Sequence, residues 1–255
     1  MKIRTFVIFL LMAGTGCGLA LAGSFSEDFQ NANGLYRAGK FSEAIVLYEK
    51  LADHYPAQGE IYFNLGNACF RSGKMGASIL AYEQAKFLNP RDRDTRHNLA
   101  HVRGLLEYRI KDKRNWYIQF GEKLLGYFTV NEVLLGFLFL YGLFMASWIL
   151  TLFFRRGLEW GWIIQSLLSM AIFSGALYGA KHIQTHVIRE AIVTVKDAEI
   201  HYGPSDSDLV ALRLGEGLKV YVIDHRDSWS RVWLTNGEGG WMANNQISGV
   251  RPKMK

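Results

Sequence analysis

The segments FSEAIVLYEKLADHYP (residues 41–56) and MGASILAYEQAKFLNP (residues 75–90) align with each other at an offset of 34 residues. A fixed period of this length is typical of a repeat architecture, in which each unit buries its apolar face against the next unit. The sequence therefore predicts a stack of helical repeats. The aligned positions are Ala44 with Ser78, Tyr48 with Tyr82, Leu51 with Ala85, and Pro56 with Pro90.

The second unit resembles the tetratricopeptide repeat, a helix pair with packing aromatics, a close-contact glycine and a terminal proline. Its first helix keeps Tyr62, Leu65 and Gly66 of that pattern. The first unit is degenerate, because Ala32 stands where the pattern favours glycine, and a third unit begins at Asp94. The resemblance implies an all-α tetratricopeptide solenoid of about 2.5 units over residues 26–110.

The same resemblance implies that the first helices of the units line a concave surface that suits an extended or helical peptide. Asn33 and Asn64 match two asparagines of the tetratricopeptide clamp for a C-terminal carboxylate. The basic residues of that clamp are replaced by Phe29, Asp94 and Asn98, so recognition of chaperone tails is not expected. The alternative is that the concave side chains are solvated surface. The predicted partner-binding residues are Asn33, Arg37, Asn64, Asn67, Arg71, His97 and His101.

Two apolar runs, residues 133–154 and 160–180, contain no Asp, Glu, Lys or Arg. Each is long enough to cross a hydrocarbon layer about 30 Å thick, so both are predicted transmembrane helices. The short loop 155–159 between them contains Arg155 and Arg156, and the positive-inside rule assigns such a loop to the cytoplasm. The soluble parts on either side are then both periplasmic.

Residues 1–22 have the pattern of a signal peptide. Lys2 and Arg4 precede an apolar run, and the small residues Ala20 and Ala22 precede Gly23, as at a signal-peptidase site. Two alternatives are lipidation at Cys17 and an uncleaved anchor. The predicted location is the bacterial inner membrane.

Residues 111–132 are predicted to be an amphipathic juxtamembrane segment. Aromatic side chains concentrate there, just before the first apolar run, and amphipathic rings prefer the headgroup level of a bilayer. The sequence predicts that they anchor the chain at the interface. These residues are Trp116, Tyr117, Phe120, Tyr127 and Phe128.

Residues 187–248 have the alternating pattern of short β-strands, at 191–195, 217–223 and 229–234. The order of Gly203-Pro204, Leu214-Gly215, Trp229 and Trp241 resembles bacterial SH3 domains. The resemblance implies a C-terminal all-β SH3-like barrel, and some members of that family bind cell-wall peptides. Trp229 and Trp241 are therefore the candidate ligand-binding residues, with packing inside the barrel as the alternative.

Composition and motifs exclude several functions. The formal net charge is +6, but acidic residues are mixed in throughout, so a nucleic-acid groove is not indicated. No nucleophile elbow, HExxH, P-loop, dinucleotide fingerprint or paired-cysteine motif is present in the sequence, which favours a non-enzymatic protein without a cofactor. His97 and His101 have metal-ligand spacing but no evident third ligand, so no metal site is predicted.

The order of signal peptide, tetratricopeptide repeats, two adjacent membrane spans and SH3-like domain resembles the BatE family of Bacteroides-type aerotolerance operons. Similar operons encode von Willebrand A-type membrane proteins and a MoxR-type ATPase. The resemblance implies a multidomain membrane protein that acts as a scaffold for an envelope complex linked to oxidative stress or protein maturation. The alternative is a cell-wall tether or sensor that binds peptidoglycan through the SH3-like domain.

Overall fold

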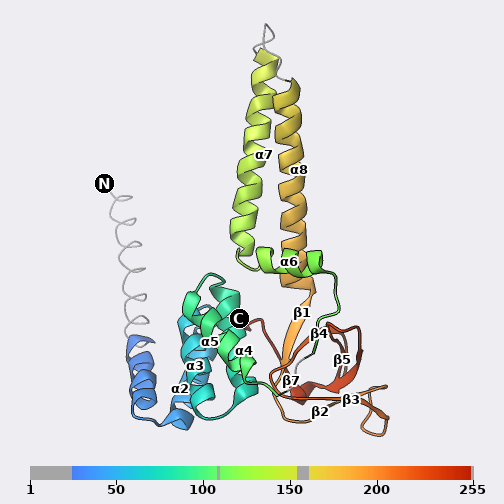
Figure 1. The fold of residues 1–255 in the computed structure, drawn as a ribbon. Helices are drawn as coiled ribbons and strands as arrows, with labels where there is room; N and C mark the ends of the chain where they lie inside the picture. The colour runs from blue at the N-terminus through green and yellow to red at the C-terminus, as the bar shows by residue number, and fades with distance from the viewer. Residues whose placement is uncertain (1–24, 108–109, 154–160, 254–255) are drawn as a thin grey trace, which may run out of the picture. The chain divides into compact units, whose positions relative to one another are not determined.

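The computed structural model describes residues 25–107, 110–153 and 161–253 (Figure 1). The predicted signal peptide 1–22, including Cys17, and the predicted loop 155–159 lie outside these residues. The described chain forms two compact units. One contains the helical repeats up to residue 107, and the other contains the long apolar helices and the C-terminal sheet.

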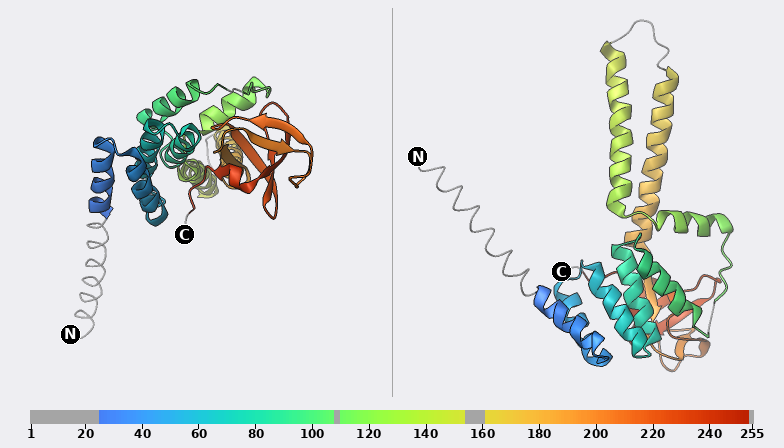
Figure 2. Two further views of the ribbon diagram at one scale, coloured as in Figure 1. Left: turned by 90° about the horizontal axis from the view of Figure 1, so that it is seen from below. Right: turned by 60° about the vertical axis from the view of Figure 1, so that its left-hand side comes forward.

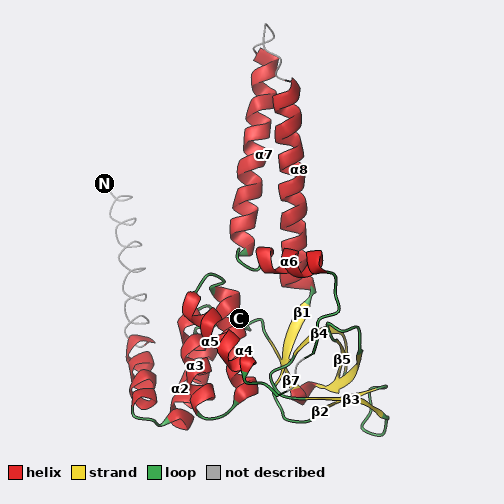
Figure 3. Ribbon diagram, in the orientation of Figure 1, coloured by secondary structure: helices red, strands yellow, loops and turns green. Residues whose placement is uncertain are grey.

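The repeat unit consists of antiparallel helices joined by short turns (Figure 3). Two of these turns contain Gly39 with φ 77° and Gly73 with φ 78°, 34 positions apart. A positive φ of this size is the left-handed region that glycine adopts without a Cβ clash, so the same turn recurs in both units. The helices are residues 25–37, α2 (Phe41–His54), α3 (Gly59–Arg71), α4 (Met75–Leu88) and α5 (Arg93–Gly104).

Close packing of α3 against α4 explains the predicted close-contact glycine. A Cβ added at Gly66 would lie 2.7 Å from ring atoms of Tyr82, which is far inside van der Waals contact. The carbonyl of Gly66 also accepts a 2.8 Å hydrogen bond from the buried Ser78 hydroxyl. In the first unit the equivalent residue, Ala32, is fully buried without such a glycine requirement. The predicted degeneracy of the first repeat therefore includes the replacement of this close-contact glycine by a buried alanine.

The other compact unit, which follows the repeats, contains a hairpin of two long helices. Helices α7 (Val130–Phe153) and α8 (Gly161–His182) are both long and apolar enough to cross a membrane. They pack through Phe137, whose ring stacks on Tyr178 with centroids 6.3 Å apart and lies 3.2 Å from the Cβ position of Gly175. The described apolar spans, Val130–Thr151 and Gly161–Val187, begin and end a few residues away from the predicted 133–154 and 160–180. The second ends in a short π-helix, η1 (Ile183–Val187).

The C-terminal residues form one antiparallel sheet of seven strands in the order β3-β2-β6-β5-β4-β1-β7. Within the described residues no ladder joins the end strands β3 and β7, so the sheet is open and the predicted closed barrel is not confirmed. Its two edges are short, and β7 has three residues. The strands are β1 (Arg189–Val193), β2 (Ala198–His201), β3 (Val210–Leu214), β4 (Lys219–Arg226), β5 (Trp229–Trp233), β6 (Gly239–Ala243) and β7 (Ile247–Gly249).

The apolar core of the sheet lies on one face. Alternating residues of the central strands point into it, among them Val220 and Val222 of β4, Val232 of β5 and Met242 of β6. This alternation is the pattern that predicted the strands near 217–223 and 229–234. Strands β2, β3, β6 and β7 were not predicted; β2, for example, has only four residues and carries the charged Glu199 among its apolar ones.

Candidate functional site

Two equivalent polar triads lie on the first-helix face of the repeats. Each consists of an asparagine, a tyrosine 15 positions later and a second asparagine 31 positions later. The two triads are related by the 34-residue period of the sequence. The same hydrogen-bond network between helices therefore recurs in both repeats, in addition to the apolar core.

The first triad joins the helix at 25–37 to α2 and α3. The side-chain oxygen Oδ1 of Asn33 accepts a 2.6 Å hydrogen bond from the Tyr48 hydroxyl and a 3.1 Å bond from Nδ2 of Asn64. Tyr48 is 1% exposed, so its hydroxyl requires such a partner inside the protein. Asn33 and Asn64, the two residues matched to the carboxylate clamp, thus contact each other.

The second triad joins α3 to α4 and α5. Oδ1 of Asn67 accepts a 2.6 Å bond from the Tyr82 hydroxyl and a 3.0 Å bond from Nδ2 of Asn98. Nδ2 of Asn98 also lies 3.5 Å from the Tyr82 oxygen. The tetratricopeptide resemblance placed Asn98 at a concave position of the third unit, but its hydrogen bonds to Asn67 and Tyr82 were not predicted.

A pocket of about 180 Å³ opens beside the first triad. Four of the predicted binding residues contribute to its wall, and they come from two different helices. The period that relates the repeats thus brings side chains far apart in the sequence to one site. The lining residues are Asn33, Tyr36, Arg37, Tyr48, Asn64 and Asn67.

The hydrogen bonds of the triads determine what the pocket offers to a ligand. Because Oδ1 of Asn33 and of Asn67 each accept two bonds, the Nδ2 amide of each residue remains available as a donor within the described structure. Arg37 is exposed and adds a guanidinium with several donors. The pocket therefore favours ligands with oxygen acceptors, such as peptide carbonyls or a carboxylate.

Burial fixes the protonation of the two triad tyrosines. It raises the pKa of Tyr48 to about 12 and the pKa of Tyr82 to about 12, because the phenolate would be poorly solvated inside the repeat. Both hydroxyls therefore remain donors to their asparagines throughout the physiological pH range. The buried thiol of Cys69 behaves similarly, since burial raises its pKa to about 12.

The other predicted residues of the concave face lie outside this pocket. The guanidinium of Arg71 stacks over Phe41 at 4.8 Å from the ring centroid. His101 makes an edge contact with Phe70, with centroids 5.7 Å apart, and Nδ1 of His97 is 3.5 Å from Oδ1 of Asn98. Within the described residues no group of three or more His, Cys, Asp or Glu side chains is placed to hold a metal ion.

The predicted ligand residues of the sheet, Trp229 and Trp241, are each 8% exposed. They lie on neighbouring strands, on the face opposite the apolar core, because the core residues Val232 and Met242 alternate with them. The His201 ring contacts Trp229 edge-on, with centroids 5.2 Å apart, and pairs with Trp241 in the ladder. The indoles thus form a second, smaller cluster.

Arg226 covers part of this tryptophan cluster. Its guanidinium lies 5.2 Å from the ring centroid of Trp241, within the range of a cation–π contact. A ligand that contacts the face of this indole would have to displace Arg226. Neither Arg226 nor His201 was predicted from the sequence, because their contacts with the two tryptophans depend on strand register.

Comparison with known proteins identifies the repeats. Residues 29–93 match the model of a family described as tetratricopeptide repeat. This match confirms the tetratricopeptide part of the prediction, and with it a fold used for protein–protein interaction. No curated protein matches the chain.

Among solved structures, a similar one is the type III secretion translocator chaperone SycD of Yersinia enterocolitica, in an alternative dimer. The identity is 15% and the TM-score is 0.30, with 64% of this chain and 94% of that chain covered. The family match and the structure together show tetratricopeptide-type helical repeats, two helices of membrane-spanning length and an antiparallel sheet.

Proposed function

We propose that the protein is a non-enzymatic, membrane-anchored scaffold that binds a peptide segment of a partner protein in its repeat pocket. The observation that supports this most directly is the donor set of the pocket, formed by the amides of Asn33 and Asn67 with the guanidinium of Arg37. Donors on successive repeats suit successive acceptors along an extended main chain. Such a ligand has carbonyl oxygens at regular spacing, and a C-terminal carboxylate adds a charge for Arg37.

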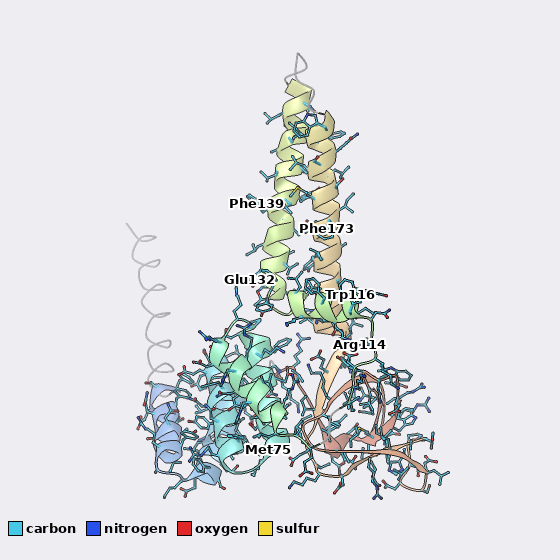
Figure 4. All side chains as sticks on the ribbon, in the orientation of Figure 1. Met75, Arg114, Trp116, Glu132, Phe139 and Phe173 are labelled. Atoms are coloured by element: carbon cyan, nitrogen blue, oxygen red, sulfur yellow. The ribbon has the colours of Figure 1, made fainter. Side chains whose placement is uncertain are left out.

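The anchoring half of the proposal is supported by α7 and α8. Large apolar side chains point outward along both helices, including Phe139 at 67% and Phe173 at 66% exposure (Figure 4). An exposed apolar surface of this length is unstable in water and suits lipid. Together with the basic loop and the signal-like N-terminus in the sequence, this favours an inner-membrane protein whose repeats and sheet are periplasmic.

The wider context comes from the resemblance to the BatE family. In this proposal the sheet is an SH3-like domain, and the partner is an envelope protein, with von Willebrand A-type membrane proteins as the first candidates. The complex would serve oxidative-stress tolerance or protein maturation.

Site-specific cross-linking in intact membranes tests the scaffold function. A photoreactive phenylalanine is placed at Tyr36, which lines the pocket, and in a matched variant at Val46, which is 62% exposed outside it. We expect a defined adduct with a membrane protein from position 36 and none from position 46. The adduct should be lost in Arg37→Glu and retained in Lys50→Glu, which makes the same charge change at an exposed position of α2. Retention in Arg37→Glu would contradict the proposal.

The second candidate function is the cell-wall tether. It is favoured by the position of Trp229 and Trp241 outside the main core of the sheet. It predicts that the protein sediments with purified sacculi and that Trp229→Ala or Trp241→Ala abolishes this while the sheet remains folded. Arg226→Ala should strengthen sedimentation, because it uncovers the indole of Trp241. Sedimentation that is unchanged in all three variants would exclude this function for the tryptophan cluster.

A further inference from the structure

The short helix α6 (Trp116–Leu125) contains no buried residue. Its large apolar side chains are among the most exposed in the chain, with Trp116 at 77%, Phe120 at 60%, Tyr117 at 57% and Leu124 at 51%. Leaving this much apolar surface in water is unfavourable, so such a patch on a short helix indicates a binding surface.

These four side chains share one side of α6. At about 100° per residue, Trp116, Tyr117, Phe120 and Leu124 fall within an arc of about 100°, and Glu122 lies opposite that arc. The opposite side carries Glu122 beside the smaller apolar side chains of Ile118 and Leu125, so α6 has one aromatic face and a second face that holds its only acidic residue.

The face that holds Glu122 is bound to the preceding linker and the sheet. Arg114 holds both oxygens of Asp112, with its Nε 3.0 Å from Oδ1 and its Nη2 2.7 Å from Oδ2. Its Nη1 donates a 2.6 Å bond to Glu122, and its guanidinium lies 5.9 Å from the ring centroid of Tyr221 in β4. Arg114 thus connects α6 to the sheet.

Two further contacts fix the linker and the end of α6. Ile110 packs against the apolar core of the sheet, and the amide of Lys113 donates a 3.3 Å bond to the carbonyl of Thr235. At the other end, Nζ of Lys181 in α8 donates a 3.0 Å bond to the carbonyl of Leu125. Helix α6 is therefore held at both ends, while its aromatic face remains exposed.

Helix α6 lies at the foot of the α7–α8 hairpin, with its axis crosswise to the two long helices, in both side views (Figures 1 and 2). Only residues 126–129 separate it from α7. Trp116 and Arg114 lie near the same end of it (Figure 4). A helix in this position, next to an apolar hairpin and directed across it, lies where the surface of a bilayer around the hairpin would be.

The charges around α6 fit the same location. The acidic residues of the linker and helix, Asp112 and Glu122, are both bound to Arg114. Lys111, Lys113 and Lys123 are exposed. The outward charge is therefore positive, which is complementary to anionic phospholipid headgroups.

We propose that α6 lies in the plane of the bilayer that holds α7 and α8, with its aromatic face at the boundary between headgroups and acyl chains. Through Arg114 it then holds the C-terminal sheet at the membrane surface. This inference rests on the membrane anchoring proposed above, and it adds a lipid-binding surface outside the two spans.

Spin labels on the full-length protein in vesicles of phosphatidylethanolamine and phosphatidylglycerol test the proposal. In a Cys17→Ser background, single cysteines replace Phe120 on the aromatic face, Ile118 on the other side of α6, or Phe139 in the middle of α7. The native Cys69 should not react, because its thiol is buried and its pKa is raised to about 12. The measurement is the ratio of collisions with oxygen, which partitions into lipid, to collisions with a water-soluble nickel complex.

We expect the oxygen-to-nickel ratio at position 120 to be several-fold higher than at position 118 and lower than at position 139. Labels at 116 and 124 should follow position 120. A low ratio at 120 together with a high ratio at 139 would overturn the α6 proposal and leave the anchoring intact. A low collision rate of position 120 with both reagents would also overturn it, because that result indicates a protein partner. A low ratio at 139 would overturn the anchoring itself.

Discussion

The two triads of the repeat unit have the same atoms in the same roles but different surroundings. Asn33 and Asn67 each accept bonds from a buried tyrosine and a following asparagine, with closely similar distances. Beside the first triad, Tyr36 and Arg37 line a pocket. The repeat period places Phe70 and Arg71 beside the second.

Those two neighbours explain why the second triad has a different surface. Phe70 is in contact with His101, and Arg71 is stacked over Phe41. Arg71, the equivalent of Arg37, therefore uses its guanidinium for packing between the repeats and does not line a pocket. The triad is thus a structural element common to both repeats, and the adjacent pair of residues determines whether a pocket opens beside it.

The largest expected effect that separates the units is at the close-contact glycine. Gly66→Ala places a Cβ 2.7 Å from the Tyr82 ring and should destabilise the repeats by about 2–3 kcal/mol, as overpacked cores do. The reciprocal change Ala32→Gly, at the equivalent buried position, should cost about 1–2 kcal/mol, because it lowers helix propensity and removes a buried methyl group. Pulse proteolysis of the repeat unit in urea measures both. A cost of Gly66→Ala no larger than that of Ala32→Gly would contradict the close contact between Gly66 and Tyr82.

Alkaline pH should weaken both triads together. Tyr48 and Tyr82 have pKa values of about 12, above the usual value near 10, so the folded state retains protons that the unfolded state loses. Their contribution to stability is complete below about pH 10 and is lost as the pH rises toward 12, by on the order of 1–2 kcal/mol per tyrosine. The urea midpoint of the repeat unit against pH reports this loss. Tyr48→Phe should remove about half of the pH dependence, and an unchanged slope would contradict the assignment.

Removing one hydroxyl at neutral pH should have a smaller effect. Tyr48→Phe and Tyr82→Phe each delete a 2.6 Å bond to an asparagine oxygen and should cost about 1 kcal/mol. Tyr82→Phe should cost more, because the Asn98 amide also approaches the Tyr82 oxygen at 3.5 Å. Urea midpoints of the two variants, compared with Tyr36→Phe as a control outside the triads, decide this order. The reverse order would show that the first triad is the stronger one.

The smallest effect on stability is expected at the paired arginines. Arg71→Ala should cost about 0.5–1 kcal/mol by removing the stack on Phe41, whereas Arg37→Ala should leave stability unchanged. Cross-linking from position 36 should show the opposite order, with Arg37→Ala affecting the adduct and Arg71→Ala sparing it. If Arg71→Ala also removed the adduct, the second unit would have to belong to the binding site.

The repeats and the apolar helices could be predicted because their signals are periodic or long. A 34-residue offset and two uncharged runs do not depend on the detail of side-chain packing. The sheet was predicted only in part. The strands at 219–226 and 229–233 have eight and five residues, whereas β7 has three residues and follows the short 3-10 helix η2 (Asn244–Gln246). Whether the edges of the sheet close depends on long-range pairing, which a local pattern does not contain.

The site was predicted as a set of residues but not as a network. Asn33, Arg37, Asn64 and Asn67 were selected by their place in the repeat, and they line the pocket. The repeat pattern treats Tyr48 and Tyr82 as core aromatics, and their hydroxyl bonds to asparagines 15 positions earlier follow only from the helix packing. Arg71 has the same place in its repeat as Arg37, and its stack on Phe41 does not follow from the repeat pattern.

Asn67 belongs to the wall of the pocket and to the second triad at the same time. A ligand that takes its Nδ2 donor would restrain the amide whose oxygen holds Tyr82 and Asn98, and through them α4 and α5. Backbone amides of α5 should then exchange with deuterated solvent more slowly when the pocket is occupied, although α5 contributes no residue to the wall of that pocket. Occupancy of the first repeat would thus be detectable in the third.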